Sequence, residues 1–186
     1  MKYLIYILII IFVQTESSAT DRNTTEALSL AAEKSKSPLE LYPITDLYYK
    51  YGLITRLPLI PPVKEPLRIS SKYGYRTDPL SKQRTFHSGV DIVVALATPV
   101  VSTADGKVIL SRKHGGYGRC IMVRHYYGYS TIYGHLSAYY CSVGDSVHQG
   151  QVIGFSGSTG RSTGNHLHYE LRKNGKHIKP VWYGYK

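Results

Sequence analysis

The sequence predicts an all-β domain of the antiparallel sandwich or barrel class, preceded by a partly helical N-terminal extension. Between about residues 90 and 171, short runs rich in β-branched and aromatic residues alternate with glycine-containing turns. Strands of this length and spacing are typical of antiparallel sheets. Earlier in the chain, helix formers are followed by several prolines, which interrupt regular elements. The two regions therefore differ in fold class.

The individual strands can be placed from residue 90 onward. Asp105-Gly106 and Gly115-Gly116 are the main turn signals between them. The expected strands cover residues 90–94, 98–103, 107–110, 120–125, 129–133, 147–155 and 167–171. We expect residues 67–184 to form one domain around them.

The first 19 residues have the features of a secretory signal peptide. A basic start is followed by an apolar run over 3–13 and by small residues at Ser17 and Ala19. The run is shorter than the roughly 20 residues of a membrane-spanning helix, so cleavage is favoured over a retained anchor. Thr20 rather than a cysteine follows, which argues against a lipoprotein. We expect an exported protein in the periplasm or at the cell wall.

Residues 20–66 are predicted to be an extension and linker. Good helix formers occupy residues 26–34, with Thr24 or Thr25 as the expected N-cap. The prolines that mark the linker are Pro58, Pro61, Pro62 and Pro66.

The charge of the chain favours anionic partners. It has 23 Lys and Arg against 12 Asp and Glu, a net charge of +11. For an exported protein this surplus points to anionic wall polymers rather than nucleic acid, although a solvated basic surface would look the same. The oligomeric state is left open. Cys120 and Cys141 are too few for a typical cysteine zinc site, and their pairing is also left open.

Two histidines on one predicted strand are the first sign of a metal site. In a strand over 165–171, His166, His168 and Glu170 share one face, while the intervening leucines and tyrosine share the other. We expect the apolar face to pack on the core and the polar face to open onto a cleft.

His87 and Asp91 can complete that site. Four extended residues span about 13 Å, so the backbone must bend between them, and we expect Gly89 to permit the bend. Catalytic zinc sites use three protein ligands and leave one position to water. Two histidines and one carboxylate would meet that rule.

The other histidines carry weaker signals. Taken alone, His135 would more often be a structural residue. We interpret the rest as surface or structural residues: His114, His125, His148 and His177.

Three segments together resemble the signature segments of the lysostaphin-type (LytM-type) zinc metallopeptidases. They are HSGVD (87–91), YGHLS (133–137) and GNHLHYEL (164–171), in the order found in the family. The flanking segments YGYR (73–76) and VGD (143–145) also agree, and the resemblance extends over about residues 67–182.

The resemblance implies a site and an activity. His87, Asp91 and His168 would hold one Zn²⁺ per chain in a groove of an antiparallel β domain, and His135 and His166 would be the catalytic pair. The substrates would be peptidoglycan peptides, cleaved within stems or cross-bridges. No glutamate is placed as in an HExxH helix, so a histidine must accept the proton of the attacking water.

Two further residues are weaker candidates. Arg76 could hold a substrate carboxylate in a bidentate contact, and Glu170 could orient a neighbouring group. An ordinary ion pair explains either residue equally well.

Three other functions compete with this prediction. A non-catalytic wall-binding or hydrolase-activating module of the same fold is disfavoured by the complete ligand set. A biotinyl- or lipoyl-type carrier, suggested by the turns at 143–147 and 150–153, leaves the histidines unexplained. A D,D-carboxypeptidase or dipeptidase acting on the same substrate could use the same zinc ligand types, but the His-x-His strand argues against it.

Overall fold

The structure is a computed structural model that describes residues 18–64 and 66–183. The predicted signal peptide lies outside these residues except for Ser18 and Ala19, which begin helix α2 (Ser18–Lys34). Two compact units divide the chain, the first ending at Ile54 and the second beginning at Thr55. Within the described residues, no helix combines the length and apolar character needed to cross a membrane.

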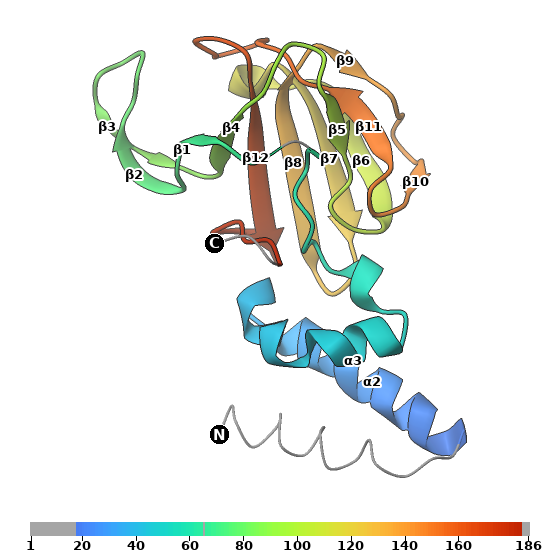
Figure 1. Ribbon diagram of the computed structural model, residues 1–186. Helices are drawn as coiled ribbons and strands as arrows, with labels where there is room; N and C mark the ends of the chain where they lie inside the picture. The colour runs from blue at the N-terminus through green and yellow to red at the C-terminus, as the bar shows by residue number, and fades with distance from the viewer. Residues whose placement is uncertain (1–17, 65, 184–186) are drawn as a thin grey trace. The chain divides into compact units, whose positions relative to one another are not determined.

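The first unit is helical. Helix α2 is followed by a 3-10 helix, η1 (Pro38–Ile44), and by α3 (Thr45–Lys50) (Figure 1). The predicted helix over 26–34 is confirmed, but the predicted N-cap is wrong because the helix begins earlier. Thr25 lies inside it, and its hydroxyl donates to the carbonyl of Asp21 at 2.9 Å, a common contact of helical threonines. The unit has its own small core, in which the buried Tyr48 hydroxyl donates to the Leu28 carbonyl at 2.6 Å.

The second unit is built from antiparallel strands, as predicted. Its largest sheet has the strand order β1-β4-β12-β8-β7-β6-β10, with β13 also paired to β12 (Figure 1). A three-stranded sheet has the order β5-β11-β9, and β2 and β3 form a separate pair. The strands are β1 (Ile69–Ser71), β2 (Gly74–Thr77), β3 (Arg84–His87), β4 (Val90–Val93), β5 (Pro99–Val101), β6 (Gly106–Lys113), β7 (Arg119–His125), β8 (Tyr129–Leu136), β9 (Ala138–Tyr139), β10 (Ser146–Val147), β11 (Val152–Phe155), β12 (His166–Lys173) and β13 (Lys176–Ile178). The chain also forms two short 3-10 helices, η2 (Ile54–Arg56), where the first unit ends and the second begins, and η3 (Gly115–Tyr117).

One predicted strand is wrong. The single strand expected over 147–155 is two strands, β10 and β11, which belong to different sheets. Between them Gly150 has a φ of 81°, a left-handed conformation that breaks the extended chain. Strands β1, β2, β3, β9 and β13 were not predicted.

The Asp105-Gly106 turn connects two sheets rather than two strands of a hairpin. Strand β5 before it pairs with β11, whereas β6 after it pairs with β7 and β10. Asp105 holds the chain where it passes from one sheet to the other. Its carboxylate accepts hydrogen bonds from the Thr55 hydroxyl at 2.5 Å and from the backbone amide of Gln149 at 2.8 Å. A Cβ at Gly106 would lie 2.4 Å from the Arg124 carbonyl oxygen, so only glycine fits there.

The core lies on one face of the large sheet. Leu167, Tyr169 and Leu171 of β12 are fully buried, which confirms the predicted apolar face. The hydroxyl of Tyr169 lies 3.0 Å from the Thr103 hydroxyl, so its polar end is satisfied inside the core. Cys120 and Cys141 are both free thiols.

His125 is part of this core and makes folding sensitive to acid. Its Nδ1 donates to the Asp105 carbonyl at 3.0 Å, and its Nε2 lies 2.7 Å from the Thr131 hydroxyl. Burial lowers the pKa of His125 to about 4. Since the folded-state pKa is below the unfolded one, the unfolded chain binds more protons between these two values. The stability contributed by neutral His125 is therefore complete above about pH 6.5 and is lost as the pH falls towards 4.

We expect the unfolding free energy to drop by about 3 kcal/mol between pH 7 and pH 4 through this one residue. Denaturant unfolding of the parent chain and of His125→Gln at several pH values measures the effect. The variant should be less stable at pH 7 and should show a shallower pH dependence over this range. Identical pH slopes in the two proteins would contradict the prediction.

Candidate active site

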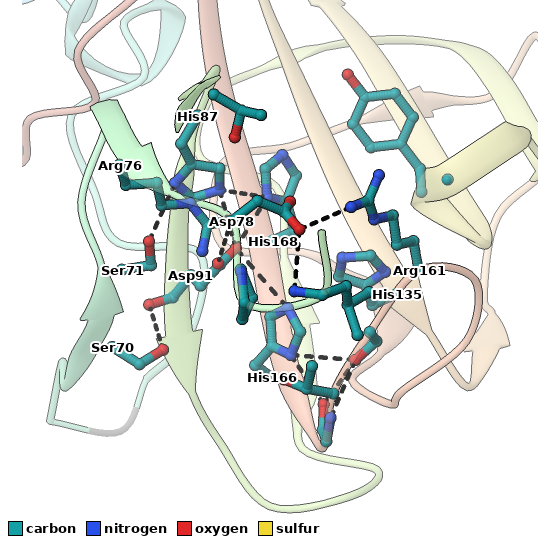
Figure 2. Close-up of a pocket in the computed structure, with 18 of the residues that line it drawn as sticks. Ser70, Ser71, Arg76, Asp78, His87, Asp91, His135, Arg161, His166 and His168 are labelled. Atoms are coloured by element: carbon teal, nitrogen blue, oxygen red, sulfur yellow. Dashed lines mark hydrogen bonds and ion pairs between the residues drawn. The ribbon is translucent and has the colours of Figure 1, made fainter. Parts of the chain in front are cut away.

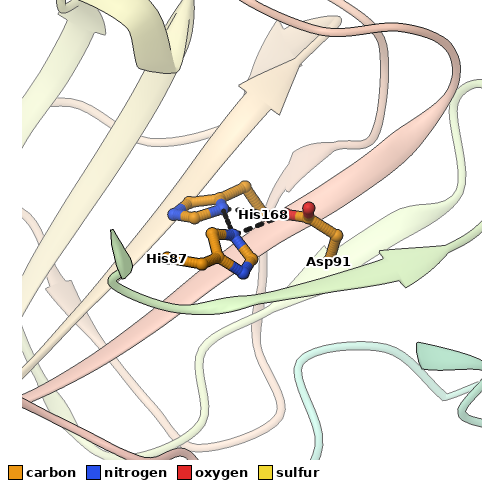
Figure 3. Close-up of side chains that lie close together, drawn as sticks. All are labelled: His87, Asp91 and His168. Atoms are coloured by element: carbon orange, nitrogen blue, oxygen red, sulfur yellow. Dashed lines mark hydrogen bonds and ion pairs between the residues drawn. The ribbon is translucent and has the colours of Figure 1, made fainter. Parts of the chain in front are cut away.

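Three strands bring His87, Asp91 and His168 together. His87 ends β3, Asp91 lies in β4, and His168 lies in β12 directly opposite Asp91 in the register of the two strands. Asp91 Oδ1 is 2.9 Å from His168 Nδ1 and 3.2 Å from His87 Nε2, and the two nitrogens are 3.1 Å apart. Figure 3 shows the three side chains pointing toward one another. The predicted convergence is therefore present, and all three residues are buried.

Gly89 lies at the predicted bend of the chain, and a glycine is needed there for lack of space rather than for an unusual backbone angle. Its φ is not in the left-handed region, so it is not needed for an unusual backbone angle. A Cβ there would instead lie 2.3 Å from the Tyr169 carbonyl oxygen. The chain between His87 and Asp91 therefore passes so close to β12 that only glycine fits.

The remaining ring nitrogens set the tautomers of both histidines. His87 Nδ1 donates to the Lys72 carbonyl at 3.0 Å, and His168 Nε2 donates to Glu170 Oε1 at 3.2 Å. In the neutral rings, His87 Nε2 and His168 Nδ1 then carry lone pairs directed at the same point as Asp91 Oδ1. Burial opposes ionisation of Asp91. When the two rings carry a second proton, however, the hydrogen bonds that Asp91 accepts from His168 and His87 outweigh burial and hold its pKa well below the usual range.

This donor set fits a zinc ion. Zinc binds histidine nitrogen and carboxylate oxygen at about 2.0–2.2 Å, and the three atoms are close enough for one ion to reach all of them. The second nitrogen of each histidine is held by a carbonyl or carboxylate, as is usual around protein-bound zinc. His87, Asp91 and His168 are therefore the residues that would hold the metal.

Glu170 does not open onto a cleft, contrary to the prediction for this strand face. It is fully buried, because Ser88 and Tyr117 from other parts of the chain cover it. Its carboxylate accepts from the Tyr117 hydroxyl at 2.7 Å, from Arg172 Nη2 at 2.9 Å and from the Ser88 hydroxyl. Burial opposes its ionisation, yet the hydrogen bonds from His168, Ser88 and Tyr117 lower its pKa to about 2. An ionised Glu170 thus fixes the His168 ring.

Replacing Glu170 with glutamine should weaken zinc binding by about 10- to 100-fold, the usual cost of losing such a supporting carboxylate. Glutamine keeps the shape of the side chain but removes the negative charge. That charge increases the electron density on His168 Nδ1 and so makes it a better zinc ligand. Competition with a chromogenic chelator measures the zinc affinity, and Glu33→Gln on the exposed surface is the matched control. An unchanged affinity in a folded Glu170→Gln protein would contradict this role.

His135 and His166 lie beside the three converging residues. His135, near the end of β8, is buried and has a φ of 61°, a conformation uncommon for residues other than glycine. The ring centroids of His135 and His166 are 4.6 Å apart, and His166 Nε2 lies 3.7 Å from Asp91 Oδ1. All five predicted residues are thus brought together in one place.

Backbone carbonyls orient both of these rings in the same way. His135 Nδ1 donates to the Thr159 carbonyl at 2.8 Å, and His166 Nδ1 donates to the Gly164 carbonyl at 2.8 Å. The free nitrogen of each neutral ring is therefore Nε2, which can accept a proton. Burial lowers the pKa of His135 to about 4, although the Thr159 carbonyl acts in the opposite direction. His135 is neutral at pH 7.

These residues line a single open pocket of about 650 Å³. Figure 2 shows His135 and His166 beside the His168 and Asp91 side chains. Arg76 of β2 also lines it, with Nη2 3.5 Å from Asp91 Oδ2. Residues of the segment between β11 and β12 line the pocket as well, including Arg161. Arg161 was not singled out from the sequence.

The other four histidines lie where the sequence predicted, on the surface or in structural positions. The His114 ring is exposed and stacks on Tyr117, and the His148 side chain is 86% exposed. His125 is in the core, and His177 Nδ1 lies 3.3 Å from Glu170 Oε2.

Three metal donors in an open pocket of an antiparallel β domain are the arrangement expected of a metal-dependent hydrolase. The chain belongs to peptidase family M23, because residues 85–180, about half of its length, match the model of that family. This confirms the resemblance to lysostaphin-type enzymes.

The curated relatives are much longer proteins. Over 120 residues the chain is 49% identical to the "DD-carboxypeptidase/endopeptidase Mpg" of Neisseria meningitidis, covering 63% of this chain and 28% of that protein. Over 121 residues it is 41% identical to the "Peptidoglycan DD-endopeptidase ShyA" of Vibrio cholerae, covering 64% and 28%. The chain therefore spans only about a quarter of the length of these relatives.

Solved structures agree with the fold. A zinc-containing peptidase from Vibrio cholerae superposes with a TM-score of 0.59 at 36% identity, covering 63% of this chain and 37% of that one. The catalytic domain of lysostaphin from Staphylococcus simulans gives a TM-score of 0.56 at 33% identity, covering 61% and 89%. The predicted lysostaphin-type antiparallel fold is thus confirmed.

Proposed function

We propose that this protein is a zinc-dependent endopeptidase that hydrolyses peptide cross-links or stem peptides of bacterial peptidoglycan. The observation that carries the proposal is the convergence of His87 Nε2, Asp91 Oδ1 and His168 Nδ1 within 3.2 Å of one another in an open pocket. These three residues would hold one Zn²⁺ per chain. Family membership and the printed names of the relatives support both the metal and the substrate class.

A zinc ion at this position would acidify a bound water to a pKa of about 7 and would polarise the carbonyl of the scissile bond. The chain supplies the groups that move the proton. His135 and His166 both present Nε2 as an acceptor because their Nδ1 atoms are held by carbonyl groups. The ring that takes the proton of the attacking water becomes a donor, which can stabilise the developing oxyanion or protonate the leaving amine.

The rest of the chain fits an exported wall hydrolase. We assign residues 67–184 to the metallopeptidase domain, 20–66 to an extension and linker, and 1–19 to a signal peptide. The location would be the periplasm or the cell wall. The net charge of +11 suits anionic wall polymers as additional partners. Arg76 stays a proposed substrate-binding residue, although its contact with Asp91 occupies part of its guanidinium.

A second activity, D,D-carboxypeptidase, has one specific point in its favour. The relative at 49% identity is named as both a carboxypeptidase and an endopeptidase. The non-catalytic alternative is disfavoured because all three donor residues and both neighbouring histidines are present and oriented.

Digestion of purified cross-linked muropeptides tests both activities. The protein is incubated with them as prepared, with a chelator, and after zinc is added back, and the products are identified by mass. Conversion of dimers to monomers that stops with chelator and returns with zinc is expected. Loss of a single terminal residue would identify the carboxypeptidase, and unchanged muropeptides in every arm would overturn the proposed function.

A further inference from the structure

An ion pair joins the two walls of the pocket. Asp78 lies just after β2, and Arg161 lies 83 positions later in the segment between β11 and β12. Arg161 Nη2 is 2.7 Å from Asp78 Oδ1, and both residues line the pocket. Figure 2 shows the two side chains meeting, with His135 and His166 also in view. The proposed mechanism uses neither residue.

The Asp78 carboxylate is held more firmly than the Arg161 guanidinium. Asp78 Oδ1 also accepts from the backbone amides of Leu80 at 2.9 Å and Ser81 at 2.7 Å, so its carboxylate is fixed in its own turn. The backbone of Arg161 is fixed as well, since its amide donates to the Gly116 carbonyl at 2.8 Å. The Arg161 side chain, by contrast, is 53% exposed, and its Asp78 contact is with one nitrogen. The guanidinium is therefore the part that can change partner.

Arg161 also lies on the backbone segment that positions the two histidines. The Thr159 carbonyl holds His135, and the Gly164 carbonyl holds His166. Arg161 lies between Thr159 and Gly164 in the sequence and lines the same pocket as His135 and His166 (Figure 2), so a group bound to its guanidinium would share that pocket with the histidines. In a substrate, that group would be near the scissile bond.

The chemistry of the guanidinium points to a carboxylate. Arg76 and Arg161 are the two basic residues with permanent charge among those that line the pocket in the described part of the chain. Arg76 is 29% exposed and lies against Asp91, a member of the donor set. Arg161 instead pairs with a carboxylate that no proposed step requires. Exposed ion pairs contribute little stability, so a ligand can replace Asp78 at small cost, and arginine binds carboxylates in a bidentate manner.

We propose that Arg161 is a substrate-binding residue that takes a free carboxylate of the peptide close to the scissile bond, and that Asp78 holds the guanidinium in the pocket until the substrate arrives. This inference rests on the proposed function and narrows its substrate class to peptides with such a carboxylate. A site that recognises a free carboxylate near the scissile bond could accept either a C-terminal residue or a cross-linked residue of the peptide, provided that the residue carries such a carboxylate.

Binding of matched peptides tests the proposal without hydrolysis. The probes are a fluorescent stem pentapeptide and versions in which each free carboxylate is converted to a carboxamide, one at a time. Their dissociation constants are measured on the zinc-loaded full chain carrying His135→Ala, which suppresses turnover. We expect one carboxamide to bind about tenfold more weakly than the parent peptide, the loss expected for a charge-assisted hydrogen bond.

Three further substitutions in that background separate recognition from general damage. Arg161→Gln should reduce the preference for the carboxylate to less than about twofold. Arg84→Gln, which removes an exposed charge from the β2–β3 hairpin that carries Asp78, should leave it intact. Asp78→Asn should bind the parent peptide more tightly, because asparagine still accepts from Leu80 and Ser81 but no longer competes as an anion. In the hydrolytic chain, Arg161→Gln should raise KM more than it lowers kcat.

Equal binding of all the peptides would overturn the proposal, as would an Arg161→Gln protein that loses affinity for parent and carboxamide peptides alike. A carboxylate preference that depends on Arg161, in a protein that hydrolyses no muropeptide, would support this inference and contradict the proposed function. The two failures are therefore distinguishable.

Discussion

Replacing His168 with alanine is expected to remove the zinc ion and, with it, measurable hydrolysis of muropeptides. His168 supplies Nδ1 to the donor set and is held by both Asp91 and Glu170, so its loss leaves two ligands and an unsupported carboxylate. We expect zinc content to fall from about one per chain to a small fraction. Activity should fall at least about 10³-fold, because the several kcal/mol that a metal contributes to the transition state are lost. Metal analysis and muropeptide digestion on the same preparation measure both effects.

His148→Ala is the control for this substitution, since it removes an exposed histidine outside the pocket. It should keep full zinc content and activity. His87→Ala and Asp91→Ala should behave like His168→Ala. A His168→Ala protein that retains one zinc per chain at unchanged affinity would show that the metal is held elsewhere.

Substitution of His135 or His166 should have the opposite combination of effects, with zinc retained and hydrolysis lost. Neither residue belongs to the three-atom donor set, so zinc content should stay near one per chain. Activity should fall about 10²- to 10⁴-fold, the usual contribution of a positioned acid or base. The double variant should be little worse than the worse single one if the two rings act as a unit. Zinc analysis and initial rates on a defined muropeptide dimer make the comparison.

His114→Ala provides a matched surface control, because its ring stacks on Tyr117 without lining the pocket. It should be nearly as active as the parent chain. A fully active His135→Ala or His166→Ala enzyme would refute the assigned pair. Loss of zinc from either variant would instead indicate that the substituted histidine is a metal ligand.

The strand that organises the site can be predicted from the sequence, but its register against the neighbouring strand cannot. Alternation of polar and apolar residues over 165–171 correctly predicts which side chains of β12 face the core. Pairing of His168 with Asp91 depends on how β12 lies against β4, which is a tertiary property. The resemblance of three short segments to a family supplied what periodicity could not.

Glu170 shows why burial was misjudged from the pattern. A polar residue on the same strand face as two histidines was expected to face a cleft. Ser88 and Tyr117 cover it from positions 82 and 53 residues away, and the local sequence around Tyr117 gives no sign of that contact. Such coverage comes from loop packing rather than from strand periodicity.

The groups that orient the histidines could not be predicted for another reason. They are main-chain carbonyls of Lys72, Thr159 and Gly164, and every residue type has a carbonyl. Gly89 was identified correctly as the residue of the bend, but the reason that only glycine fits there is its close approach to Tyr169. Arg161 and Asp78 carried no signal of contact because their turns are joined only in the folded domain.

Anomalous X-ray scattering at the zinc absorption edge, from crystals of the purified, active full-length protein, tests the central claim most directly. The account predicts one strong peak about 2 Å from His87 Nε2, Asp91 Oδ1 and His168 Nδ1. A peak at any other group of side chains, with none among these three residues in a protein that hydrolyses muropeptides, would contradict it.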